Sequence, residues 1–320
     1  MTAYILRRLV ISVPVLLGIT LFTFLFINLA PGDPISAMIP PTERHTLTPE
    51  ALDAKREELG LNRPLPVRYA IWMGQLVRGN LGYSYADRRP VTMHIRERIG
   101  PTLELSGCAL ALALLVATPL GIISALKQYS VVDYLLTVLS FVAVSIPGFF
   151  LALGAIYVFS LRLHLLPTSG MRTVGQPRSL EDHLEHLLLP VAILSLERVG
   201  PFMRFVRSSV LEVIQQEYVT TARAKGLAER LVILRHALRN ALIPLITIVG
   251  LSLPSIFGGA VLLETIFSWP GLGMLSVAAV FQRDYTVLMG LGFASAVLIL
   301  LSNLLTDICY VVVDPRIRYH

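Results

Sequence analysis

The residues of this sequence that could do chemistry are concentrated in one basic stretch of a mostly apolar chain. Positions 211–244 read LEVIQQEYVTTARAKGLAERLVILRHALRNALIP, and their basic residues are Arg223, Lys225, Arg230, Arg235 and Arg239. Lysine and arginine pair with carboxylates and phosphates, so the predicted chemistry is binding to an anionic surface. One interpretation is a passive basic collar on anionic lipid headgroups.

Motifs of catalysis and of nucleotide binding are absent from the sequence. No G-x-x-x-x-G-K-[ST] loop, no H-E-x-x-H and no G-x-S-x-G occurs, and the seven histidines are scattered. These motifs supply phosphate binding, zinc binding and a serine nucleophile, respectively. We therefore predict no catalytic residue, no metal site and no cofactor bound by this chain.

The composition is that of a membrane protein. Of the 320 residues, 54% are hydrophobic and only 15% are charged, against about 25% in a soluble domain, and the mean hydropathy is +0.68. Runs of about 20 apolar residues span a bilayer as helices. Five runs without Asp, Glu, Lys or Arg meet this criterion: Leu9–Ala30, Leu105–Leu126, Tyr134–Leu161, Ala241–Leu263 and Thr286–Thr306.

A sixth, weaker run covers Leu187–Phe205 and includes Glu197 and Arg198. Arginines flank both ends of the chain, and short basic flanks remain in the cytoplasm. Both termini are therefore predicted inside, which requires an even number of spans. We predict an all-α membrane protein with six transmembrane helices, and the net charge of +6 indicates topology rather than binding to nucleic acid.

The predicted organisation follows from these spans. Residues 1–30 hold the cytoplasmic N-terminus and the first span, and 31–104 form a periplasmic helical segment. Residues 105–313 hold five further spans, including a cytoplasmic loop at 208–240, and 314–320 are the cytoplasmic C-terminus. Within the periplasmic segment we expect helices after Thr48 and over Pro66–Arg78. A third, amphipathic helix at 90–100 is expected to lie on the membrane surface before the second span.

Two parts of the basic stretch, EYVTTARAKGL and RHALRNALIP, closely resemble the cytoplasmic loop of the membrane subunits of ATP-binding-cassette (ABC) importers. The general pattern of that loop is Glu-Ala-Ala, three residues, Gly, nine residues, then Ile-x-Leu-Pro. Aligned on Gly226, this chain keeps Ala222 and Leu238. It departs at Thr220, Thr221, His236 and Arg239, and its ARAKGL and HALRNALIP resemble the variant of the dipeptide, oligopeptide and nickel permease branch.

The rest of the chain resembles that branch in the same order. The matching segments are RRLVISVPVLLGITLFTF, PGDP, LGLNRPLPVRY, PTLELS, SIPGF, ETIFSWPGLG, RDYTVL and DPRIRYH. The resemblance implies the type I ABC importer permease fold in a bacterial inner membrane. It also implies a second, homologous permease subunit, two ATPase subunits that bind ATP and Mg, and a periplasmic or lipid-anchored substrate-binding protein; this chain resembles the first of the two permeases.

The resemblance also assigns roles to particular residues. The loop becomes a coupling helix on the ATPase, with contacts expected from Glu217, Ala222, Arg223, Lys225, Gly226 and Leu227. Candidates for the translocation pathway are Ser145, Glu197, Ser252 and Ser255, although Glu197 could equally pair with a neighbouring helix, since an uncompensated charge is costly in lipid. Trp269, Pro270 and Gly271 form either a simple turn or a periplasmic loop that reaches toward substrate.

Proline and glycine are concentrated in the runs Tyr134–Leu161 and Ala241–Leu263. This pattern is typical either of kinked helices around a cavity or of close helix packing. The cargo predicted from the branch is a di- or oligopeptide or a related small solute, with nickel chelates and glutathione as alternatives. A self-sufficient carrier or a non-transporting scaffold is a more distant alternative, because the spans hold few ionisable groups for a proton relay.

Overall fold

A computed structural model describes the chain except for residues 1, 30–34, 36–48, 59, 258–260 and 314–320. The described residues are helical apart from turns and one isolated β-bridge between Tyr83 and Pro90. The chain divides into two compact units, which are described separately. Unit 1 holds residues 1–100 and 271–300, and unit 2 holds residues 101–270 and 301–320.

Unit 1 contains α1 (Thr2–Leu29), α3 (Pro49–Glu58), α4 (Leu65–Val77), α14 (Leu272–Phe281) and the first half of α15 (Tyr285–Val313). The predicted helices after Thr48 and near Pro66–Arg78 are confirmed as α3 and α4. Trp72 and Leu76 lie one turn apart on α4, and both are buried in a cluster with Phe24 of α1 and Met289 of α15. An apolar face at helical spacing thus attaches α4 to the helices of unit 1.

Asp284 ties the segment before α5 to the start of α15. Its carboxylate accepts hydrogen bonds from the Ser84 hydroxyl (2.6 Å) and the Tyr85 amide (2.9 Å), and it also accepts from the Val287 amide (3.1 Å). The last of these bonds is the N-cap interaction of α15. The buried aspartate of the RDYTVL segment therefore both starts a helix and fixes a distant loop.

The helix expected on the membrane surface at 90–100 does not exist as a separate element, and that prediction is wrong. Val91 begins α5 (Val91–Leu126), which continues through Pro101 into the second apolar run. Val91 is fully buried against Leu272, Val287 and Leu291 of the same unit. The apolar stripe of this turn is therefore covered by protein rather than by lipid.

Unit 2 begins at Pro101 of α5 and continues through α6 (Val131–Ser145), α7 (Gly148–Ala155) and the π-helix η1 (Ile156–Arg162). The run predicted as one span at Tyr134–Leu161 is sharply bent: the axes before and after the break differ by 94°. Pro147 lacks an amide hydrogen and excludes helical geometry at the preceding residue. Ile146 is accordingly extended, with φ −87° and ψ 123°.

The remaining helices of unit 2 complete the apolar elements. They are α8 (Leu180–Ile214), α9 (Glu217–Ala224), α10 (Glu229–Leu231), the π-helix η2 (Val232–Ala237), α11 (Leu238–Ala241), α12 (Ile243–Phe257) and α13 (Val261–Ile266). In the described part of the chain, four helices are long and apolar enough to cross a membrane, and the bent pair makes a fifth. One of the four is α8, which contains the weak run around Glu197. The predicted run Ala241–Leu263 corresponds to α12 and α13, with 258–260 outside the described residues.

Candidate functional site

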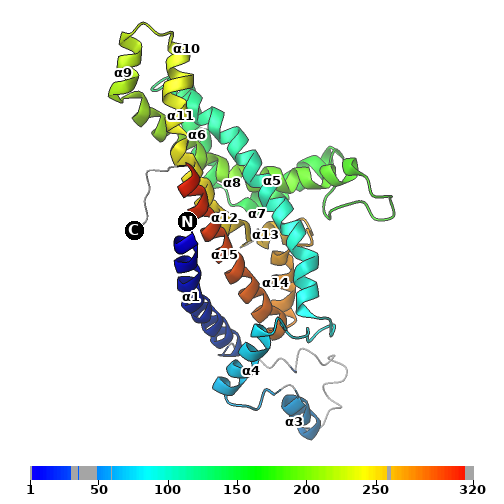
Figure 1. Ribbon diagram of the computed structural model, residues 1–320. Helices are drawn as coiled ribbons and strands as arrows, with labels where there is room; N and C mark the ends of the chain where they lie inside the picture. The colour runs from blue at the N-terminus through cyan, green and yellow to red at the C-terminus, as the bar shows by residue number, and fades with distance from the viewer. Residues whose placement is uncertain (1, 30–34, 36–48, 59, 258–260, 314–320) are drawn as a thin grey trace. The chain divides into compact units, whose positions relative to one another are not determined.

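The basic stretch folds into a short helical hairpin at the end of α8. Figure 1 shows α9 beside α10. The helix α9 packs against η2, which follows α10, and α11 packs along α8. Val219 and Ala222, three residues apart on α9, are buried with Val232 of η2. Residues at this spacing share one helix face, so α9 turns one apolar face inward and its other face toward solvent.

The six residues expected to contact the ATPase divide between these two faces. Glu217, Arg223, Lys225, Gly226 and Leu227 are exposed in this chain. Ala222 is only 6% exposed, because it packs against η2. Its small side chain lets the two arms of the hairpin approach closely, and the exposed residues form the surface that another protein could reach.

Gly226 ends α9 in the way the sequence predicts. Its φ is +77°, and its amide donates to the Arg223 carbonyl at 2.9 Å. This left-handed conformation after the last helical turn is the usual place for a C′ glycine. A Cβ built on Gly226 would meet no atom within 4 Å. Glycine is therefore required here by the backbone conformation and not by lack of space.

A charge pair that the sequence did not reveal closes the turn after α9. The Arg223 guanidinium donates to the Glu229 carboxylate from Nη2 at 2.7 Å and from Nε at 3.1 and 3.2 Å. Hydrogen bonding to Arg223 holds the pKa of Glu229 below its usual range, and the same contact raises the pKa of Arg223. Arg223 therefore braces the hairpin within this chain.

The base of the hairpin is fixed to the transmembrane helices. The Ser209 hydroxyl of α8 donates to the Ala241 carbonyl of α11 at 2.8 Å, and both residues are buried. Near the same base, the side-chain amide of Asn240 on α11 donates to the Tyr218 hydroxyl at the start of α9, at 3.0 Å. Only two residues separate α8 from α9, so one arm of the hairpin continues from α8 and the other is held to it by the Ser209–Ala241 hydrogen bond.

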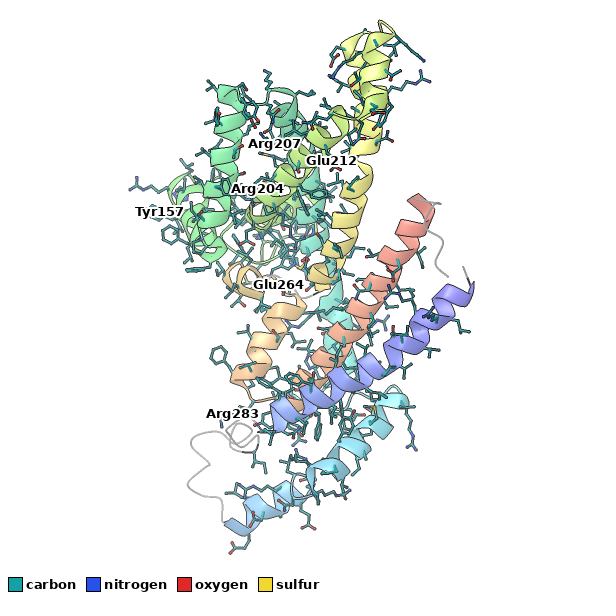
Figure 2. All side chains as sticks on the ribbon, turned by 90° about the vertical axis from the view of Figure 1, so that its left-hand side faces the viewer. Tyr157, Arg204, Arg207, Glu212, Glu264 and Arg283 are labelled. Atoms are coloured by element: carbon teal, nitrogen blue, oxygen red, sulfur yellow. The ribbon has the colours of Figure 1, made fainter. Side chains whose placement is uncertain are left out.

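A second unpredicted pair joins α8 to α6. Asp133 is 3% exposed and accepts from Arg207 Nε and Nη2, both at 2.8 Å, in a bidentate arrangement. The Ser124 hydroxyl (2.5 Å) and the Tyr129 amide (3.0 Å) complete the shell of the carboxylate. Figure 2 shows Arg207 on α8. In the sequence, Ser130 three residues before Asp133 indicates only a helix start, because the partner lies 74 residues away.

The four pathway candidates lie in two places. Ser145 ends α6, and Gly148, which starts α7, lies against the Glu197 carboxylate so closely that a Cβ would overlap it. The structure thus brings Ser145 and Glu197 to the same break in the bent span. Ser252 and Ser255 lie about one turn apart on α12, and their hydroxyls donate to the Ile248 and Ser252 carbonyls, respectively.

The SWPGLG segment is anchored inside the chain. Trp269 is fully buried, its Nε1 donates to the Pro101 carbonyl at 2.8 Å, and its amide donates to the Glu264 carbonyl at 2.7 Å. Pro270 is half-buried, and buried Gly271 precedes the first residue of α14. These contacts hold Trp269 inside this chain, and the role of the loop toward substrate stays a prediction.

Within the described residues, no group of three or more His, Cys, Asp or Glu side chains could hold a metal ion.

Comparison with known proteins identifies the family to which the chain with this hairpin and these spans belongs. Residues 117–319 match the family described as "Binding-protein-dependent transport system inner membrane component", and residues 1–106 match its companion N-terminal family. The chain belongs to this family.

Relatives of this inner membrane component match it from end to end. It is 44% identical to a putative peptide permease protein of Brucella suis, over 99% of each chain. It is 43% identical to the oligopeptide transport system permease protein AppB of Bacillus subtilis, over 100% of each. With the dipeptide transport system permease protein DppB of Escherichia coli the identity is 38%, over 100% of this chain and 99% of the relative.

The fold is also that of a solved ABC transporter. A chain of the inward-facing MetNI methionine ABC transporter matches with a TM-score of 0.57 at 15% identity, covering 70% of this chain and 97% of that one. The protein is thus a multi-pass inner membrane permease subunit of a binding-protein-dependent ABC importer. It works with a substrate-binding protein and a partner ATPase, and it is a transport subunit rather than an enzyme.

Proposed function

We propose that this permease carries di- or oligopeptides and forms half of the translocation pathway with a second, homologous permease subunit. The observation that supports this cargo most strongly is the full-length similarity to permeases named for peptides, oligopeptides and dipeptides. A similarity that includes both the N-terminal segment and the spans is a stronger guide to cargo than a match to the coupling loop alone.

The exposed face of the α9 hairpin is the docking site for the ATPase subunits in this proposal. Glu217, Lys225 and Leu227 offer one acid, one base and one apolar side chain around the turn at Gly226, and all are exposed. Mixed charges fix the register of an interface and an apolar side chain supplies packing. Two ATPase subunits bind ATP and Mg, and their closure displaces α9 toward or away from the membrane.

The bent span supplies the pathway in this proposal. Ser145 ends α6 just before the break, and Glu197 lies against Gly148 just after it. A break in a membrane helix is tolerated where it is covered by protein or lines an aqueous cavity. Ser252 and Ser255 on α12 contribute hydroxyl groups from a second helix. Substrate passes these groups when the hairpin moves, and the binding protein selects what reaches them.

The test is transport by the assembled complex in proteoliposomes. This permease is reconstituted with its second permease and ATPase subunits, and loaded binding protein is supplied at the outer face. ATP-dependent uptake of labelled di- or oligopeptide is the expected result. Uptake of a nickel chelate or glutathione, with no peptide uptake, would overturn the peptide cargo, and solute uptake by this chain alone would overturn the dependence on ATPases.

A further inference from the structure

An apolar groove of about 490 Å³ lies between α5, α6, α7 and α8 of unit 2. Its lining extends on α8 from Ala192 to Met203, and from Leu136 of α6 to Ile146 just after that helix. Ser140 and Ser195 are the hydroxyl-bearing side chains of its lining, and both donate to carbonyls of their own helices. The groove therefore offers an almost purely hydrocarbon surface.

Arg204 directly follows Met203, the last lining residue on α8, and its guanidinium lies beside the groove at Ser140. Its Nη1 is 3.5 Å from the Ser140 hydroxyl, and its guanidinium carbon lies 4.6 Å from the centre of the Phe141 ring. Figure 2 shows Arg204 on α8, in the turn before Arg207. Arg207 is neutralised by Asp133, whereas the ion pairs found among the described residues do not include Arg204. Most of its five N–H donors therefore remain available for an anion.

The length of the groove fits one leaflet of a bilayer. Eleven steps along α8 from Ala192 to Met203 rise about 16 Å, and half of a hydrocarbon core of about 30 Å is about 15 Å. Arg204, one residue beyond Met203, then lies near the level of the headgroups. An apolar groove about one leaflet long, with a guanidinium beside it, is complementary in shape and charge to a single anionic phospholipid.

We infer that this groove binds one anionic phospholipid, with an acyl chain between α6 and α8 and the phosphate on Arg204. Arginine is suited to phosphate because its planar donors bind two oxygens together. The predicted topology assigns this lipid to the inner leaflet, which carries a negative surface potential. Bound there, the lipid packs along α6 and α8 on the side of Arg204, close to the Asp133–Arg207 pair that joins these two helices.

The experiment is native mass spectrometry of the full-length permease and of the assembled transporter, released from nanodiscs of phosphatidylglycerol and phosphatidylcholine. We expect phosphatidylglycerol to be retained in preference to phosphatidylcholine. Arg204→Gln should weaken this retention about fivefold, the effect of one basic residue at an anionic surface. Ala143→Phe, which fills the groove, should lower retention of either lipid.

Arg162→Gln is the matched control, because Arg162 also lies over an aromatic ring, that of Tyr157 at 5.6 Å, at the other end of the bent span. Its retention of phosphatidylglycerol should equal that of the parent. If Ala143→Phe lowers thermal stability, Val142→Phe at a more exposed lining position replaces it. Equal retention by the parent and Arg204→Gln would overturn the site, as would retention unaffected by filling the groove. A cysteine at Val142 that crosslinks to the second permease would also overturn it, because a protein helix would then occupy the groove.

Discussion

Arg223 and Glu229 are held together across the turn that contains Gly226, with the Arg223 Nη2 at 2.7 Å from a Glu229 carboxylate oxygen. The pair joins the last turn of α9 to the first residue of α10, so it sets the angle between the two arms of the hairpin. Both side chains are substantially exposed, at 39% and 56%. An exposed pair contributes little to global stability, and its effect is expected on coupling.

Breaking the pair should loosen the hairpin without unfolding the protein. We expect Glu229→Gln and Arg223→Gln each to raise the amount of ATP hydrolysed per peptide transported. The double variant Arg223→Glu with Glu229→Arg, which swaps the two charges, should bring this amount partway back to the parental value. Arg230→Gln, which removes a neighbouring exposed charge, is the control. An unchanged ratio in both single variants would show that the brace has no part in coupling.

The pH dependence of this pair has a defined sign. The pKa of Glu229 is lowered in the folded chain, so its stabilising contribution is present above the unfolded pKa of roughly 4.3. It is lost as the pH falls through the folded pKa, which is lower still. The difference between the parent and Glu229→Gln in ATP hydrolysed per peptide transported should therefore be constant between about pH 6 and 8.

Removing Asp133 should have a much larger effect on stability. The carboxylate is buried and paired with Arg207 in a bidentate arrangement, and loss of one partner leaves a charge without compensation. Asp133→Ala is expected to cost about 1–3 kcal/mol of unfolding free energy, because the Arg207 left behind is partly exposed; the cost is measured by thermal unfolding of the purified chain in detergent. Exposed Glu212→Gln should change it by less than about 0.5 kcal/mol. If Asp133→Ala costs no more than Glu212→Gln, the Asp133–Arg207 pair does not stabilise the fold.

The predicted topology is tested by cysteine accessibility. In a chain without Cys108 and Cys309, we place a single cysteine at Val174, which is 98% exposed, or at Thr220 on the outer side of α9. A membrane-impermeant maleimide should label position 174 in intact spheroplasts and position 220 only after permeabilisation. The opposite pattern would invert the assignment of the hairpin to the cytoplasm.

Local signals in the sequence predicted local structure well. The glycine after an amphipathic turn placed the end of α9, and the apolar spacing of Trp72 and Leu76 predicted the buried face of α4. The length of the apolar runs and their lack of charged residues predicted most of the spanning helices. These features depend on residues within one or two turns of each other, and a single sequence contains that information.

The errors and omissions arose where distant residues decide the structure. The turn at Val91 was predicted to lie on a membrane surface, because nothing in the sequence shows that Leu272 and Leu291 cover it. Gly100 and Pro101 resemble a helix end, yet α5 continues through both. The Asp133–Arg207 pair joins residues 74 positions apart. The proline and glycine content of the bent run left kinking and close packing equally open, and the sequence did not predict a 94° bend at Pro147.

The central claim is that α9 and the turn at Gly226 couple the permease to its ATPases, and substitution of Gly226 tests it most directly. A Cβ meets no neighbour at this position, so Gly226→Val and Gly226→Asn differ mainly in how well they accept φ +77°. Asparagine tolerates this region, whereas a β-branched residue is disfavoured by roughly 1–2 kcal/mol, about a 5- to 30-fold shift in population.

The measurement is ATP-driven peptide uptake and ATPase activity of the reconstituted transporter, with a pull-down of the ATPase subunits to establish assembly. We predict that Gly226→Val loses most uptake, and that its ATPase activity falls or becomes independent of loaded binding protein. Gly226→Asn should remain close to the parent in both assays. If the fully assembled Gly226→Val transporter takes up peptide at the parental rate, the assignment of coupling to this turn is contradicted.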